Sequence, residues 1–138
     1  MKRRYFISLI VAATTTIAIG QLAIAQDNRV IVPFKPTSAD EKAIVAIFNQ
    51  RYPLKSVITE LVVIDGYGLL NQVTGETGGQ VLVRQDTKQG WQIVRGTGGV
   101  LDVKFMVKQG CPEVTAKALQ KLIQKQSKEH YETRQKHR

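Results

Sequence analysis

The first regular pattern along the chain is that of a helix. Ser38 and Glu41 form a capping box, in which each side chain satisfies a backbone N–H group at the start of a helix. Pro53 ends the helix, because the residue before a proline disfavours helical dihedral angles. The apolar residues between these limits recur at helical spacing and form one face: Ile44, Ile47, Phe48 and Tyr52. The segment therefore predicts a helix that packs on the core through that face.

Four segments after this helix have the pattern of strands. Residues 57–64 are rich in β-branched side chains and almost uninterrupted, which is typical of a well-covered strand. Asp65 and Gly66 then supply a tight hairpin turn. Glycines and polar residues separate the later strands, which are expected at residues 67–74, 80–85 and 91–95. Connections of hairpin length favour antiparallel neighbours, so the sequence predicts a four-stranded meander.

The C-terminal third predicts two further helices. The Gly-Thr-Gly-Gly run at 96–99 interrupts the fourth strand, and residues 100–110 predict a short helix or turn. Pro112 suits the first position of a long helix, and Glu113 lies favourably against its N-terminal dipole. The predicted order is helix, four strands, short helix and long helix. This is the α+β class, with helices covering one face of a curved antiparallel sheet and the C-terminal helices packed on that face.

The N-terminal segment has the pattern of a secretory signal peptide. Residues 1–4 are basic, residues 6–20 are largely apolar, and Ala23-Ile24-Ala25 fits the small-x-small rule, so we expect cleavage after Ala25. The alternative is an uncleaved membrane anchor, because about 20 residues span a bilayer. We therefore expect export to the periplasm, the thylakoid lumen or the outside of the cell. The predicted organisation is a signal peptide at 1–25, an extended lead-in at 26–36, a single α+β domain at 37–126 and a basic tail at 127–138.

Charge adds a feature to the C-terminal helix. The chain has 138 residues and a formal net charge of +9, and 43% of its residues are hydrophobic, which indicates about one globular domain. The residues expected on the face of the helix that packs on the body are Ala118, Leu119, Leu122 and Ile123. The opposite face carries a stripe of lysines at helical spacing: Lys117, Lys121, Lys125 and Lys128.

The lysine stripe has two interpretations. One is a solvated helix face followed by a frayed tail. The other is a contact with an anionic surface, such as phospholipid headgroups, a cell-wall polymer or an acidic protein. Predicted export disfavours nucleic acid as the partner, and no membrane span is expected once the signal peptide has been removed.

Candidate catalytic groups are few. His130 and His137 lie in the predicted tail, so a Ser or Cys nucleophile in the body has no imidazole to assist it. Their spacing also predicts no metal site, and the glycine runs match neither a P-loop nor a dinucleotide fingerprint. We therefore predict no catalytic residue, no metal and no cofactor. A small carboxylate-dependent hydrolase stays open as an alternative, with the candidates Asp65, Glu76, Asp86 and Asp102.

Five residues are candidates for ligand binding. They are two aromatic residues at strand ends, two glycines and the single cysteine: Tyr67, Trp91, Gly98, Gly99 and Cys111. The alternatives are cross-strand packing for the aromatic residues and turns for the glycines. Cys111 has three alternatives. Its thiolate could be favoured by the start of the long helix and by nearby Lys108, it could form an intermolecular disulfide, or it could be a buried inert thiol.

Several short stretches together resemble a group of small, mostly uncharacterised exported proteins of cyanobacteria. The resemblance covers roughly residues 55–122, and the chain departs from the group's pattern at Cys111, where the group has an apolar residue. The resemblance implies a compartment and a fold, and no activity or cofactor. The stretches that carry it are Tyr67-Gly-Leu-Leu, Gly75-Glu-Thr-Gly-Gly79, Trp91-Gln-Ile-Val, Gly98-Gly-Val-Leu101, Gly110-Cys-Pro112 and residues 116–119.

The expected function is a non-catalytic binding or accessory role in the cell envelope. A concave sheet face or the glycine-rich rim would contact the partner, which is an unidentified envelope protein or an anionic surface. The first alternative is interaction with the envelope surface through the basic C-terminal helix. The second alternative is the carboxylate-dependent hydrolase.

Overall fold

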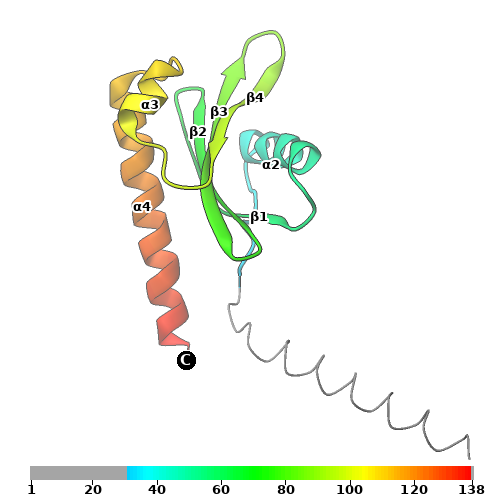
Figure 1. The fold of residues 1–138 in the computed structure, drawn as a ribbon, viewed down its shortest axis with the longest axis vertical. Helices are drawn as coiled ribbons and strands as arrows, with labels where there is room; N and C mark the ends of the chain where they lie inside the picture. The colour runs from blue at the N-terminus through cyan, green and yellow to red at the C-terminus, as the bar shows by residue number, and fades with distance from the viewer. Residues whose placement is uncertain (1–30, 138) are drawn as a thin grey trace, which may run out of the picture. The chain divides into compact units, whose positions relative to one another are not determined.

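The computed structural model describes residues 31–137, and those from Val32 onward belong to one compact unit (Figure 1). The predicted signal peptide and the first part of the lead-in lie outside the described residues. The strands form one antiparallel sheet in the order β1-β2-β3-β4, which confirms the α+β class and the meander. The elements are α2 (Ala39–Arg51), β1 (Ser56–Ile64), β2 (Tyr67–Thr74), β3 (Thr77–Asp86), β4 (Gly90–Thr97), α3 (Val103–Lys108) and α4 (Glu113–Lys136).

Helix α2 starts at the predicted capping box. The Glu41 N–H donates to Ser38 Oγ at 3.1 Å, and Glu41 Oε2 accepts from the N–H groups of Ser38 and Thr37 at 3.1 and 2.7 Å. The hydrogen bond from the Thr37 N–H is the main cause that lowers the pKa of the Glu41 carboxyl. Tyr52, just before Pro53, already has extended dihedral angles and caps the other end. Both limits of this helix are therefore set by local chemistry.

Helices cover both faces of the sheet (Figure 1). Helix α2 packs on one face over a core cluster that includes Phe48, Leu70 and Val81. Helices α3 and α4 pack on the opposite face over a second cluster that includes Leu82 and Leu119. The expectation that all helices share one face is wrong for α2, although the C-terminal helices do pack on one face as predicted. The physical reason is that neighbouring apolar residues of a strand point to opposite faces, so both faces need a cover.

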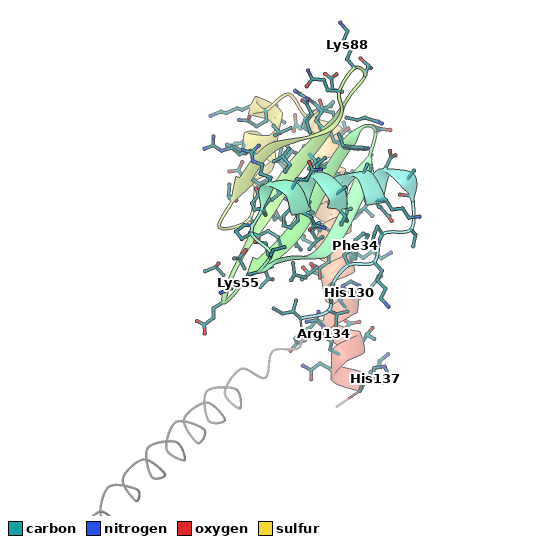
Figure 2. All side chains as sticks on the ribbon, turned by 90° about the vertical axis from the view of Figure 1, so that its right-hand side faces the viewer. Phe34, Lys55, Lys88, His130, Arg134 and His137 are labelled. Atoms are coloured by element: carbon teal, nitrogen blue, oxygen red, sulfur yellow. The ribbon has the colours of Figure 1, made fainter. Side chains whose placement is uncertain are left out.

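Helix α4 continues through the segment that was expected to be a basic tail. It ends at Lys136, and its last turns extend beyond the sheet in both views (Figures 1 and 2). Two ion pairs at i,i+4 spacing support these turns, and their nitrogen–oxygen distance is 3.9 Å in each case: Lys125–Glu129 and Lys128–Glu132. A helical arm therefore replaces the predicted tail within the described residues.

Strand β3 begins at Thr77, three positions before the prediction, because Gly78 and Gly79 belong to the strand and not to the turn. Gly79 marks a close approach between β3 and β4. A Cβ atom at this position would overlap the backbone carbonyl oxygen of Thr97, whereas a Cβ at Gly78 would have its nearest neighbour, the Gln72 carbonyl oxygen, at 3.6 Å. The absence of a side chain at Gly79 therefore lets the two strands meet.

We expect Gly79→Ala to destabilise the fold by about 1 to 3 kcal/mol, because the added methyl group forces a backbone shift between β3 and β4. Gly78→Ala is the matched control and should change the free energy of unfolding by less than about 0.5 kcal/mol. Urea denaturation of both variants measures the difference. Equal stability of the two variants would contradict the close approach.

Candidate functional site

A row of polar side chains crosses the sheet on the face that α4 covers. The strand register places Glu60, Asn71 and Gln80 side by side on β1, β2 and β3. Asn71 Nδ2 donates to Glu60 Oε2 at 3.0 Å, and Gln80 Nε2 donates to Asn71 Oδ1 at 3.0 Å. These three residues, called the polar row below, are joined by a continuous chain of hydrogen bonds across three strands.

Side chains of α4 and the chain before α3 complete the polar row. Gln80 Oε1 accepts from Gln120 Nε2 at 3.0 Å and from the Leu101 N–H at 2.9 Å. Gln120 Nε2 also donates to the carbonyl oxygen of Leu101. Asn71 Nδ2 donates to Ser127 Oγ at 3.0 Å. Because these bonds come from two successive regions of α4, they fix both the rotation and the axial position of the helix on the sheet.

The Glu60 carboxylate ends the row at β1. The residue is 7% exposed, and its Oε2 accepts from Thr59 Oγ1 at 2.5 Å in addition to Asn71. Its Oε1 lies 3.2 Å from His130 Nδ1. Among residues 31–137, His130 is the basic side chain that pairs with Glu60. Buried carboxylates need such partners, because an unpaired charge is costly away from water. His130 therefore belongs to the body of the domain and not to a free tail.

Sequence reasoning missed the polar row. One signal was present, since Glu60 is a charged residue inside an otherwise apolar strand, and charged residues are rarely buried without a partner. The Ser127 hydroxyl accepts a hydrogen bond from Asn71 Nδ2, and the imidazole of His130 faces Glu60. Both side chains therefore attach α4 to the sheet, and they do not form a nucleophile–base pair.

Three of the four carboxylates considered for a hydrolase serve local backbone structure. Asp65 occupies the β1–β2 turn with a φ of 48°. Asp86 Oδ1 accepts from the N–H groups of Lys88 and Gln89 at 2.7 and 3.0 Å, and the Lys88 bond is the main cause that lowers the pKa of Asp86. Asp102 caps α3, where its Oδ1 accepts from the Phe105 N–H at 2.6 Å. Within residues 31–137, no group of three or more His, Cys, Asp or Glu side chains could hold a metal ion.

The predicted ligand-binding residues lie in separate places. Trp91 is on the α2 face, 7% exposed, and its Nε1 donates to Asp40 Oδ1 at 3.0 Å. Tyr67 packs against the core of the opposite face, and its hydroxyl donates to the Gly110 carbonyl oxygen at 2.9 Å. The remaining predicted residues are Cys111, in that same core, and Gly98 and Gly99, which are exposed after β4. The structure therefore brings Tyr67 close to the segment before α4 and places Trp91 on the other side of the sheet.

Cys111 is a core residue and 1% exposed. Burial raises the pKa of its thiol, which opposes the interpretation of Cys111 as a thiolate at the start of α4. A disulfide between two copies needs an accessible sulfur, so this burial favours the inert thiol among the three predicted alternatives.

All four stripe lysines of α4 are exposed. Lys117 Nζ lies 2.6 Å from Glu113 Oε1, and this hydrogen bond lowers the pKa of Glu113. Lys125 and Lys128 are also paired, as described above, whereas Lys121 forms no salt bridge within residues 31–137. The stripe therefore has a weaker positive potential than its lysine count indicates.

An apolar row lies next to the lysine stripe. Val114, Ala118 and Leu122 follow one another at i,i+4 spacing, and Val114 and Leu122 are 81% and 42% exposed. Ala118 and Leu122 were expected on the buried face, but Ala118 is half-buried and Leu122 is exposed. Leu119 and Ile123 occupy that face, and the turn of the helix leaves the intervening Leu122 at its margin. The outer face of α4 thus combines apolar and basic side chains.

An open groove of about 390 Å³ lies between α2 and β4. Its lining residues are Ile47, Gln50, Arg51, Trp91, Gln92 and Ile93. Strand β4 is one edge of the sheet, and β3 is its neighbour in the part of the chain that the structure describes. At the other edge, the Phe34 N–H donates to the Ile58 carbonyl oxygen of β1 at 2.8 Å. The groove therefore borders the more open of the two sheet edges.

Comparisons with known proteins give no match: no protein-family model, no curated protein and no solved structure is similar to the chain. Among residues 31–137, no helix has both the length and the apolar character needed to cross a membrane.

Removing the centre of the polar row should weaken the attachment of α4. We expect Asn71→Ala to lower the free energy of unfolding by about 1 to 3 kcal/mol, because Glu60 and Gln80 each lose a buried partner. Gln135→Ala, on an exposed turn of α4, is the control and should be nearly neutral. Urea denaturation measures both variants. A loss for Asn71→Ala no larger than for the control would contradict a structural role for the row.

Proposed function

We propose that this chain is an exported accessory domain of the cell envelope with a non-catalytic binding role. The signal-peptide pattern at 1–25 and the resemblance to small exported cyanobacterial proteins support the compartment. Three of the four hydrolase carboxylates act in turns and caps, as shown above, which favours binding over hydrolysis. The helices that cover both faces argue against contact through an open sheet face.

The observation that carries the binding role is the groove between α2 and β4. The groove has apolar walls from Trp91 and Ile93 and polar groups from Gln50 and Gln92. It borders the edge strand β4, whose backbone pairs on one side only among the described residues. Half of the lining residues are apolar and half are polar, and the groove is open, which suits a surface contact better than an enclosed small-molecule site. An edge strand also offers backbone N–H and C=O groups to a partner.

Site-specific photocrosslinking in the native envelope tests this role. A photoreactive residue at Gln92 should form a protein adduct, whereas the same residue at Gln124, on exposed α4 across the sheet, should not. N-terminal sequencing of the recovered chain should begin at Gln26. Equal labelling from both positions, or a cytosolic chain that retains its leader, would refute the proposal.

A second candidate function is contact with an anionic membrane surface through α4. The apolar row of Val114, Ala118 and Leu122 beside the lysine stripe favours it, because surface helices insert apolar side chains shallowly while lysines meet the headgroups. The pairing of Lys117 with Glu113 weakens this second candidate relative to the groove.

Vesicle sedimentation distinguishes the second candidate. The mature chain should bind vesicles that contain phosphatidylglycerol and not vesicles of phosphatidylcholine alone. Lys121→Glu should reduce binding about five- to twentyfold, since each juxtamembrane lysine contributes about 1 kcal/mol. Arg51→Glu makes the same charge change on the other side of the sheet and should leave binding unchanged. Equal losses for both variants would indicate a net-charge effect and reject the α4 surface.

A further inference from the structure

We infer that the groove between α2 and β4 receives an extended acidic peptide segment, which pairs with β4 as a fifth strand of the sheet. This inference rests on the proposed binding role and names the class of partner. In this mode, backbone hydrogen bonds supply affinity and side-chain pockets supply specificity.

The regular part of the β4 edge sets the length of the contact. Residues 90–93 pair in register with β3, and the register then shifts between Leu82 and Val83, so that Val94 is an extra residue on β4. Such a bulge ends regular pairing at the outer edge as well. The groove lies beside residues 91–93, so the incoming segment pairs with this short stretch and not with the whole strand.

The groove provides a place for alternate side chains of the segment. Trp91 and Ile93 belong to the core layer beneath α2, and Ile47 lines the opposite wall. Side chains of a strand alternate between the two sheet faces. Every second residue of an added strand therefore points toward the space between α2 and β4, where an aliphatic side chain meets these three apolar groups.

Charge indicates which partner fits. Arg51 lines the groove, is exposed and forms no salt bridge within residues 31–137. Arg95 pairs with Leu82 of the opposite core and does not line the groove. An acidic segment places a carboxylate against the exposed Arg51. Asp40 lies at the other end of α2 and is bonded to Trp91, so we expect the acidic residue at the Arg51 end.

Trp91 makes the inference directly measurable, because it is the single tryptophan of the chain. Two synthetic peptides of about six residues, the usual length of a strand, serve as probes. Both alternate Val and Thr, and they differ in one residue, which is Glu in the first and Lys in the second. We expect saturable changes in Trp91 fluorescence with the Glu peptide and binding about three- to tenfold weaker with the Lys peptide.

Variants locate the binding site. Arg51→Gln should weaken the Glu peptide about two- to fivefold, and Arg51→Glu should reverse the preference between the peptides. Lys121→Glu, on the other side of the sheet, is the control with the same charge change and should leave both affinities unchanged. Amide exchange of the mature chain should slow at residues 90–93 when the Glu peptide is bound.

No saturable response up to millimolar peptide, no preference between the peptides, or slowed exchange confined to other strands would overturn the inference. Loss of the peptide response together with a specific adduct from Gln92 in the envelope would leave the binding role intact and reject the acidic strand. Failure of both experiments would reject the binding role as well.

Discussion

The hydrogen-bonded row from Glu60 through Asn71 to Gln80 is the constraint on which the arrangement of the domain depends. Buried polar groups need partners, and each member of this row has its partner on the next strand or on α4. A slip of one residue between β1 and β2 would move Glu60 to the other face of the sheet and separate its carboxylate from Asn71 and His130. The row therefore specifies strand register and helix position together, which apolar contacts alone define less sharply.

The two helical layers are attached by different physical means. Helix α4 is oriented by hydrogen bonds to the polar row, whereas α2 lies on an apolar face and approaches the sheet closely at Gly68. A Cβ atom there would come within 2.6 Å of Val83 Cγ2 and 3.4 Å of Ile44 Cδ1. With both faces occupied in this way, partner contacts are left to the sheet edge and to the outer surfaces of the helices. This division is why the groove beside β4 and the outer face of α4 are the two surfaces that support functional proposals.

Local chemistry made most of the fold predictable, and long-range pairing limited the rest. The capping box at Ser38 and Pro53 defined α2 because each acts within a few residues of the chain. The glycines at 78 and 79 suggested a turn because the role of Gly79, the contact between β3 and β4, depends on Thr97 far along the chain. His130 was assigned to a tail for the same reason, since its partner Glu60 is 70 residues away. Which face each helix covers is likewise a property of the assembled sheet.

The candidate site shows the same limit. Trp91 stood out in the sequence as an aromatic residue at a strand end, and the structure places it in the groove while its indole nitrogen is bonded to Asp40. Arg51 had no sequence signal beyond its place near the end of a helix. It matters because α2 lies across the sheet and its C-terminal end is beside β4. The groove at this sheet edge is thus built mostly from residues that carry no signal one by one and acquire their surroundings from the strand beside them.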